Sequence, residues 1–350
     1  MKKILVTGGT GFIGSWVTKY LLEKGYQVRL SVRDITKKQE YEHLLKIKQK
    51  AKGDLELWEA DLLKDGSFDN AAKDCSAIIH MASPFTLHFK NAKKELIVPA
   101  LEGTKNVLRA ANKTQTVKKV ILTSSVAAIY GDNIDMYELN ISEFTEKNFN
   151  YSSSASHQPY SYSKTIAEKE AWKIYNNQDQ WELIVINPSF VMGPSLTNRS
   201  RSESLRFMTD LLTGKYFLGA PDLMFGFVDV RDVAKAHIIA LENKNTKGRN
   251  ILAERTINVY ELSKIIKKLY GKKYKLPLMQ TPKFILYLVG WLFNLSPKFI
   301  SRNVGYDIKL NTTKSKENMK LTYTPLENTL KDMIEQMETN KQLNKNKSNQ

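Results

Sequence analysis

The first 190 residues alternate short apolar runs with stretches in which apolar positions recur every three or four residues. Runs of five or six residues are typical of buried strands, and the longer recurrence is typical of helices packed on a sheet. This alternation predicts an α/β fold in which a doubly wound parallel sheet is covered by helices on both faces. We expect strands at Lys3–Thr7, Gln27–Val32, Leu55–Ala60, Ala77–Met81, Val120–Ser124 and Leu183–Asn187.

The pattern becomes less regular after Pro194, which predicts a second unit. We expect residues 1–190 to form the sheet domain. Residues 191–337 are expected to form mainly a smaller C-terminal lobe, with some strands and helices returning to the sheet. Two helices are marked there by their ends: one is capped by Asn258 and ends near Gly271, and the other is capped by Thr324. Residues 338–350 are rich in Asn and Lys without apolar periodicity, which predicts a disordered tail.

Composition excludes several classes of site. The single cysteine, Cys75, permits neither an intrachain disulfide nor a cysteine-based metal cage, and the five histidines have no metal-ligand spacing. We therefore expect no metal. The net charge of +17 comes mostly from scattered lysines, and no segment pairs dense arginine with aromatic residues, so we do not expect nucleic-acid binding.

No segment is long enough to be an integral membrane helix. The longest apolar stretch, Phe284–Phe293, is well short of the ~20 residues that span a bilayer, and Ile4–Val6 is too short for the core of a signal peptide. A cytoplasmic location is the expectation. For Pro282–Leu295 we favour a buried helix of the second lobe, with docking on a membrane surface as the alternative.

A glycine-rich segment follows the first predicted strand. Residues 7–14 read T-G-G-T-G-F-I-G and satisfy the G-x-G-x-x-G pattern between a strand and an amphipathic helix. Glycines let the chain turn sharply and bring backbone N–H groups against a pyrophosphate at the N-terminus of the helix. The segment predicts the dinucleotide-binding turn of a Rossmann fold. The residues expected to contact the dinucleotide here are Gly8, Gly11, Phe12, Ile13 and Gly14.

The end of the second strand indicates which dinucleotide is bound. NAD enzymes place an acid there for the ribose 2′-hydroxyl, but the expected position holds Val32, followed by Arg33 with Lys38 nearby. A cation suits the 2′-phosphate of NADP, so NADP is predicted, although Asp34 leaves an inward-turned acid open. Asp61, after the third strand, is a candidate contact to the adenine, with a helix cap as an equally good interpretation.

A Tyr-x-x-x-Lys pattern places a phenol and an ammonium one turn apart on a helix. The ammonium is expected to stabilise the phenolate and lower the phenol pKa, so that the tyrosine exchanges a proton while hydride moves. The pattern occurs at Tyr20/Lys24, Tyr160/Lys164 and Tyr260/Lys264. Only Tyr160 and Lys164 follow the fifth strand, and open α/β sheets carry their sites at the carboxyl ends of the strands.

Hydroxyl groups end the fifth strand. Ser125 is expected to hydrogen-bond and polarise the substrate carbonyl, with Ser124 as the alternative. A hydroxyl that merely caps the strand end is the structural explanation for either residue.

Several of these motifs together resemble the extended short-chain dehydrogenase/reductase superfamily. The resemblance rests on T-G-G-T-G-F-I-G-S-W at the start, L-T-S-S at Leu122–Ser125, Y-S-Y-S-K at Tyr160–Lys164 and N-P-S-F-V-M-G-P at Asn187–Pro194. The A-D-L at residues 60–62 and the H-x-A-x-P at residues 80–84 add to it. Within the superfamily the chain is most similar to the group of dihydroflavonol, cinnamoyl-CoA and aldehyde reductases, and the resemblance spans roughly residues 1–335.

The resemblance implies NADP-dependent reduction of an aldehyde or ketone, with Ser125, Tyr160 and Lys164 as the catalytic residues. It also implies that residues 1–190 bind NADP and that the C-terminal lobe binds the substrate, a small carbonyl compound that we expect to be bulky and partly apolar. Further cofactor contacts implied are Arg33, Lys38, Asp61, Leu62, Ala82, Pro188 and Ser189. A monomer and a homodimer are both compatible with the group.

The sequence departs from the reductase group at two places, and other functions therefore remain as hypotheses. Tyr130-Gly131 stands where plant flavonoid reductases carry an asparagine, and it is similar to the Tyr-Gly of epimerases, so an NAD-dependent sugar-nucleotide epimerase or dehydratase is the second hypothesis. Tyr151–Gln158, just before Tyr160, is also unusual. A non-catalytic NADP-binding regulator is the third hypothesis, and the Tyr160/Lys164 pair argues against it.

Overall fold

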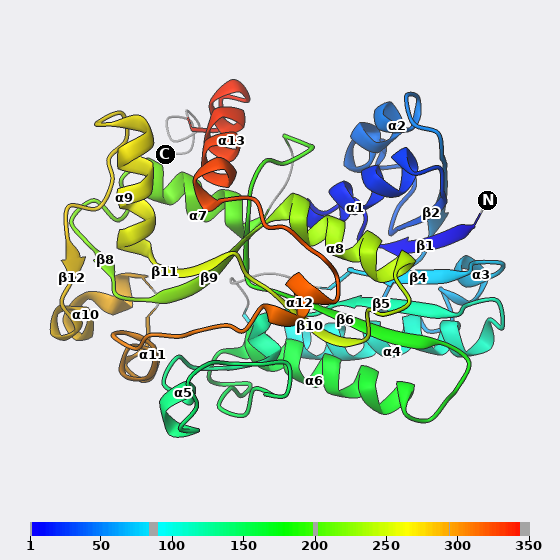
Figure 1. The fold of residues 1–350 in the computed structure, drawn as a ribbon, viewed down its shortest axis with the longest axis horizontal. Helices are drawn as coiled ribbons and strands as arrows, with labels where there is room; N and C mark the ends of the chain where they lie inside the picture. Colours follow the sequence, from blue (N-terminus) through cyan, green and yellow to red (C-terminus); the bar gives the residue numbers. More distant parts are fainter. Residues whose placement is uncertain (1, 84–89, 199–201, 294, 344–350) are drawn as a thin grey trace.

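The computed structural model describes residues 2–83, 90–198, 202–293 and 295–343. Its centre is a seven-stranded sheet in the order β10-β6-β5-β4-β1-β2-β3, with every neighbouring pair parallel (Figure 1). The predicted doubly wound α/β fold is confirmed, and each of the six predicted strands is present within one residue at either end. The strands are β1 (Lys3–Thr7), β2 (Gln27–Val32), β3 (Asp54–Glu59), β4 (Ala77–His80), β5 (Lys119–Thr123), β6 (Glu182–Pro188) and β10 (Gly248–Leu252).

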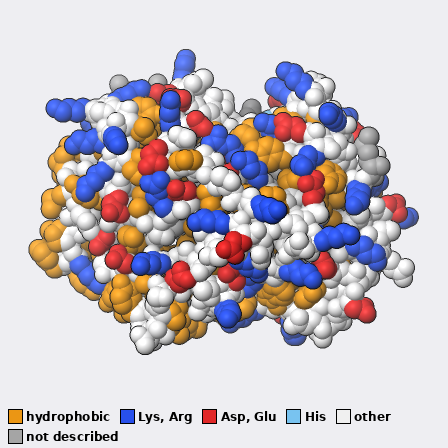
Figure 2. Space-filling view, viewed as in Figure 1, with side chains coloured by type: hydrophobic (Ala, Val, Ile, Leu, Met, Phe, Trp, Pro, Cys, Tyr) orange, Lys and Arg blue, Asp and Glu red, His pale blue; other side chains and the backbone are white. Residues whose placement is uncertain are grey.

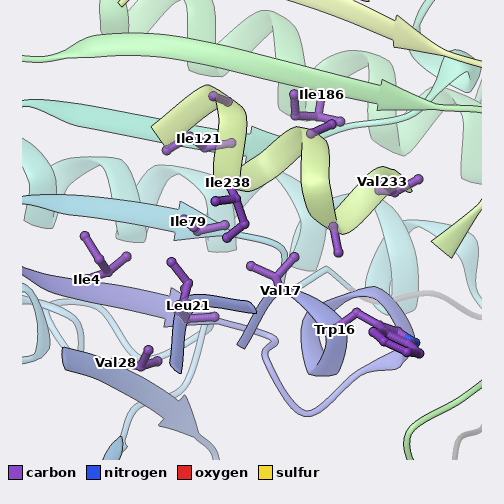
Figure 3. Close-up of a cluster of buried hydrophobic side chains, with 14 of the residues drawn as sticks. Ile4, Trp16, Val17, Leu21, Val28, Ile79, Ile121, Ile186, Val233 and Ile238 are labelled. Atoms are coloured by element: carbon purple, nitrogen blue, oxygen red, sulfur yellow. The ribbon is translucent and has the colours of Figure 1, made fainter. Parts of the chain in front are cut away.

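Both faces of the sheet are buried, because alternate residues of each strand point to opposite sides. Ile4 and Val6 of β1 pack with one cluster of apolar side chains, whereas Leu5 between them packs with another. Figure 3 shows the first cluster, in which α1 and α8 lie together against the sheet. That face is covered by α1 (Phe12–Glu23), α2 (Glu42–Lys48) and α8 (Val230–Glu242); the other carries α3 (Asp69–Ala72), α4 (Val98–Lys113) and α6 (Pro159–Tyr175).

The strand order reverses between β1 and β4. Strands β1, β2 and β3 follow one another outward in one direction, and β4, β5 and β6 continue from β1 in the other. At this reversal the Thr7 hydroxyl lies 2.7 Å from Nδ1 of His80. This hydrogen bond joins the ends of the paired strands β1 and β4. Ligands of open α/β sheets bind in the crevice that such a reversal opens at the carboxyl edge.

The second lobe lies at one end of the sheet (left in Figure 1). Its core is a three-stranded sheet in the order β11-β9-β7, packed with α7, α9 and α13. Two elements from beyond residue 190, α8 and β10, instead pack with the large sheet. The lobe contains β7 (Phe190–Met192), β9 (Met224–Asp229), β11 (Arg255–Asn258), α7 (Glu203–Leu212), α9 (Val259–Tyr270) and α13 (Leu326–Thr339).

Shorter elements complete the chain. Strands β8 (Ala220–Pro221) and β12 (Gln280–Thr281) pair with each other, and α11 (Pro297–Asn303) packs on α10 (Lys283–Val289). The remaining α-helices are α5 (Asp135–Glu138) and α12 (Thr313–Glu317); single turns of 3₁₀ or π type cover Lys38–Glu40, Lys93–Ile97, Val126–Ala128 and Gly290–Phe293.

The two predicted helix starts have different outcomes. Asn258 caps α9 as expected: its side chain accepts from the Glu261 N–H at 2.8 Å, and the Glu261 carboxylate accepts from the Asn258 N–H. The cap at Thr324 is wrong, because α13 starts after Pro325, and the Thr324 N–H and hydroxyl donate to Asp232 instead.

The predicted C-terminal tail and the predicted buried helix in Pro282–Leu295 both differ from expectation. Helix α13 continues to Thr339, so the first residues of the predicted tail are helical, and residues 344–350 lie outside the described part. The helix expected to be buried within Pro282–Leu295 is instead mostly exposed, with Leu286 as the buried side chain of α10. None of the described helices is long and apolar enough to cross a membrane.

Candidate functional site

The glycine turn after β1 is closely packed. Gly8 has φ +71°, and a Cβ there would lie 2.6 Å from the Ala82 amide nitrogen. A Cβ at Gly14 would overlap the Gly8 carbonyl oxygen and the Gly9 Cα. The turn therefore excludes side chains at Gly8 and Gly14, which leaves bare backbone beside Ala82 at the end of β4.

Helix α1 starts directly from this turn. Gly11 is its N-cap residue and has no side chain to cap it, and Gly11 N–H donates to the Gly8 carbonyl at 3.0 Å. Phe12 and Ile13, the first helical residues, are half-buried. An uncapped helix N-terminus presents N–H groups and a partial positive charge, so this end of α1 suits a pyrophosphate.

We expect Gly14→Ala to weaken dinucleotide binding by at least about tenfold, because the added methyl must displace the Gly8 carbonyl and open the turn. Isothermal titration with NADPH checks this. Gly305→Ala is the control for backbone strain without crowding: Gly305 has φ +76°, unlike Gly14, whose φ is not positive, and no atom lies within 4 Å of a Cβ built there. Equal NADPH affinity in wild type and Gly14→Ala would contradict the placement of the phosphates in this turn.

The end of β2 presents a cation. Arg33 is exposed directly after the strand, and Lys38 is exposed in the next turn. Asp34 does not turn inward: its carboxylate accepts from the N–H and hydroxyl of Thr36, at 2.9 and 2.5 Å, and these hydrogen bonds lower the pKa of Asp34. Arg33 and Lys38 are thus cations that could face a 2′-phosphate.

Asp61 has a local structural role. Its carboxylate accepts from the Leu63 N–H at 2.8 Å, and its carbonyl accepts from the Ser67 hydroxyl at 2.6 Å. The turn-capping interpretation of Asp61 thus describes its contacts within the chain. Leu62 packs against Gly103 of α4, and Asp61 itself remains exposed beside the end of β3.

Ser125, Tyr160 and Lys164 come together at the carboxyl edge of the sheet. Ser125 follows β5, and Tyr160 lies in the first turn of α6, which begins at Pro159. The Tyr160 phenol is hydrogen-bonded to Ser125, and the Lys164 ammonium lies 6.0 Å from the centre of the Tyr160 ring. A hydroxyl, a phenol and an ammonium are therefore close together at this edge of the sheet.

The electrostatics differ from the expected lowering of the phenol pKa. Desolvation by the surrounding protein raises the pKa of Tyr160 to about 12, and the Ser125 hydrogen bond offsets only part of this. Burial lowers the pKa of Lys164 to about 8, opposed by the nearby Glu168 carboxylate. Around neutral pH the phenol is protonated, which is the form that can donate a proton.

Ser124, the alternative hydroxyl, is engaged elsewhere. Its side chain donates to Glu168 Oε2 at 2.5 Å. The other two Tyr/Lys pairs also lie away from the strand ends: Lys24 pairs with Glu242, and Tyr260 donates to the Leu278 carbonyl in the second lobe. The structure brings only Tyr160/Lys164 to Ser125.

A buried ion pair beneath Lys164 was not anticipated from the sequence. The Arg249 guanidinium of β10 lies 2.5 Å from the Glu168 carboxylate of α6, and both side chains are buried. Asn187 at the end of β6 donates to Glu168 at 2.8 Å and to the Ser125 carbonyl at 3.2 Å. This group connects α6, β6 and β10 next to Ser125 and Lys164.

The crevice continues along the strand ends. Pro188 ends β6, and Ser189 beside it is buried with its hydroxyl oxygen unpartnered among the described residues. Ala82 donates its N–H to the Thr7 hydroxyl at 3.2 Å. A narrow pocket at the ends of β4 and β5 is lined by His80, Ala82, Thr104, Ser124, Lys164 and Glu168. Burial and the Lys164 charge lower the pKa of His80 to about 3, so this strand-end histidine is neutral.

The unusual segment before Tyr160 is tied to the second lobe. His157 Nε2 lies 2.9 Å from the buried Asp132 carboxylate, which also accepts from Arg302 and Asn303 near the end of α11. Gln158 has φ +54° and directly precedes α6. These contacts anchor the chain that leads into α6.

Three comparisons bear on this geometry. A model described as the NAD dependent epimerase/dehydratase family matches residues 4–259. The chain is 34% identical to cinnamoyl-CoA reductase CAD2 of Medicago truncatula, covering 97% of this chain and 96% of the relative. It is 35% identical to dihydroflavonol 4-reductase of Gerbera hybrida, covering 77% and 73%.

A solved structure is similar over nearly the whole chain. Yeast methylglyoxal/isovaleraldehyde reductase Gre2, complexed with NADPH, has a TM-score of 0.77 and 26% identity, covering 97% of this chain and 99% of that one. The similarity includes both the large sheet and the second lobe. These relatives are reductases, in agreement with the group that the sequence motifs resemble.

Proposed function

Because the chain belongs to the NAD-dependent epimerase/dehydratase family, we propose that it is an NADPH-dependent reductase that converts an aldehyde or ketone to the alcohol. The observation that carries the proposal is the meeting of Ser125, Tyr160 and Lys164 beside the side-chain-free turn at Gly8 and Gly14. The relatives named above are reductases, which supports reduction of a carbonyl as the reaction.

The cofactor fits the residues present. Gly8, Gly11 and Gly14 with the start of α1 would hold the pyrophosphate, and Arg33 and Lys38 would face the 2′-phosphate. Ala82, Pro188 and the buried Ser189 hydroxyl would line the nicotinamide end. Bound NADPH supplies the hydride that the carbonyl carbon receives.

The residues of the chain supply the proton and the orientation. Ser125 donates a hydrogen bond that holds and polarises the carbonyl oxygen. Tyr160, protonated at neutral pH, donates its phenolic proton to that oxygen as the C–H bond forms. Lys164 stabilises the phenolate that results, and one hydride and one proton together complete the alcohol.

The preference for NADPH is expected to depend on Arg33. We expect Arg33→Ala to weaken NADPH binding by about 10–100-fold, the value of a lost charge-assisted contact to phosphate, and to leave NADH binding nearly unchanged. Fluorescence titration of both cofactors checks this. Arg109→Ala is the matched control, because Arg109 is an exposed arginine on α4 paired with Asp65.

Two outcomes would contradict the assignment of Arg33. Equal affinity for NADPH and NADH in the wild type would remove the argument from the end of β2. Protein that purifies with NAD already bound would favour the epimerase hypothesis suggested by Tyr130-Gly131.

A further inference from the structure

One stretch of the second lobe carries charge of a single sign. Residues 262–306 contain eight lysines and Arg302 but no aspartate or glutamate. Lys273 and Arg302 are paired with acids from other parts of the chain. Among the described residues, no carboxylate lies within 4 Å of the ammonium groups of Lys264, Lys267, Lys268, Lys272, Lys275 and Lys298.

The same stretch exposes large apolar side chains. In α10 and the turn after it, Phe284, Leu288 and Trp291 recur at helical spacing and are 69%, 72% and 73% exposed. This spacing places them on one helical face, whereas Leu286 packs inward against Ile300 and Val304. A soluble helix ordinarily directs such a stripe inward.

The exposed stripe extends onto neighbouring loops. The Leu278 N–H donates to the Phe217 carbonyl at 2.9 Å, and the ring of Tyr216 stacks on Phe293, with centres 6.2 Å apart. Figure 2 shows hydrophobic side chains gathered along the left edge of the molecule, where Figure 1 places β12 and α10. We call the following set the apolar patch: Leu218, Leu278, Met279, Phe284, Tyr287, Leu288, Trp291, Leu292 and Phe293.

The anchoring of α10 keeps the patch directed outward. The Lys283 ammonium donates to the carbonyls of Ser301 and Val304, at 3.0 and 2.8 Å, and thereby joins the start of α10 to α11. Lys275 lies three residues before Leu278, and Lys298 is exposed on α11. The patch therefore has lysines on both flanking segments.

The charges select among possible partners. A second copy docked through the same surface would bring two acid-free basic stretches together, which is repulsive. A lipid bilayer needs no complementary groove: protruding Trp, Phe and Leu side chains enter the headgroup region while flanking lysines contact anionic headgroups. The net charge of +17 attracts the whole molecule to such a surface.

We propose that the apolar patch and its flanking lysines form a peripheral docking surface for an anionic phospholipid bilayer. The apolar patch shares no residue with the site at Ser125, Tyr160 and Lys164, so the proposal does not depend on the reductase activity.

Co-sedimentation with lipid vesicles tests the proposal. At about 0.15 M ionic strength we expect the full chain to bind phosphatidylcholine–phosphatidylserine vesicles and to bind pure phosphatidylcholine at least about tenfold more weakly. The triple variant Phe284→Ser, Leu288→Ser, Trp291→Ser is expected to lose about tenfold or more of the binding. The double variant Lys275→Glu, Lys298→Glu is expected to lose a similar amount through charge alone.

The control removes exposed apolar side chains elsewhere. Val98→Ser, Leu139→Ser should bind vesicles as the wild type does, because both residues lie outside the patch. Unchanged NADPH affinity and thermal unfolding verify that each variant is folded. Failure of the wild type to bind anionic vesicles, or unaltered binding by the triple variant, would overturn the proposal.

Dimerisation abolished by the triple variant would assign the patch to a second copy, and an acidic protein bound there without lipid binding would assign it to a protein partner.

Discussion

Tyr160→Phe is expected to lower kcat for carbonyl reduction by roughly 10²–10⁴-fold, the contribution of a positioned proton donor. The substitution removes the phenolic proton and the hydrogen bond to Ser125 but keeps the ring against Lys164. NADPH affinity should remain near the wild-type value, because the glycine turn and Arg33 are untouched. Steady-state assays with aromatic and aliphatic aldehydes, following NADPH oxidation, measure the effect.

Tyr260→Phe is the matched control for this experiment. Tyr260 also precedes a lysine by four residues, with the Lys264 ammonium 4.5 Å from its ring centre, but it belongs to α9 in the second lobe. We expect Tyr260→Phe to keep kcat within about twofold of the wild type. A Tyr160→Phe protein with unchanged kcat would remove Tyr160 as the donor. Unchanged cellular function in that variant would favour the non-catalytic regulator.

The sheet was predictable because burial on both faces leaves a simple pattern. Six strands read as short apolar runs, and the segment Ile4–Val6 already carries residues for both faces. The seventh strand, β10, was not predicted, since it reads G-R-N-I-L and buries Arg249 and Asn250. Buried polar residues interrupt the apolar run by which the other strands are recognised, so this edge of the sheet requires the three-dimensional structure.

The proximity of Ser125, Tyr160 and Lys164 was predictable because residue type and position along the strands and helices restrict it. Glycines at the turn and the Tyr/Lys spacing could be read directly, and the position after the fifth strand selected Tyr160 from three candidates. The sequence alone did not show which of Ser124 and Ser125 lies beside Tyr160. In the structure the Ser124 hydroxyl donates to Glu168, whereas Ser125 is hydrogen-bonded to Tyr160. The raised pKa of Tyr160 likewise arises from burial, which a spacing argument does not measure.

The main wrong prediction concerned Pro282–Leu295, which was expected to be a buried helix and is mostly exposed. An apolar segment at Phe284–Phe293 favours burial on average, and the sequence offers no candidate partner to contradict that expectation. The acid-free composition of residues 262–306 was the available signal. Charge of one sign around an apolar helix is typical of a surface that meets an anionic partner rather than a protein core.

Arg249→Met is expected to lower the free energy of unfolding by about 3–5 kcal/mol, because it leaves the buried Glu168 carboxylate without its cation. The guanidinium also donates to the carbonyls of Glu146 and Ala128, both at 3.0 Å, and these groups would lose their partner. Chemical denaturation monitored by tryptophan fluorescence measures the loss. Arg255→Met is the matched control: Arg255 pairs with Glu254 and Glu327 at a partly exposed position, where screening limits the loss to about 1 kcal/mol.

The double variant Glu168→Met, Arg249→Met separates the ion pair from the packing around it. Replacing a buried pair by apolar side chains of similar size is often close to neutral, so the double variant should be more stable than Arg249→Met. Its activity should nevertheless change, since the Glu168 carboxylate raises the pKa of Lys164 against the effect of burial. Without that carboxylate the pKa of Lys164 falls further, and the pH at which the rate declines as the ammonium is lost should move to lower values. If the double variant regains stability but its pH profile is unaltered, Glu168 stabilises the fold and does not set the pKa of Lys164.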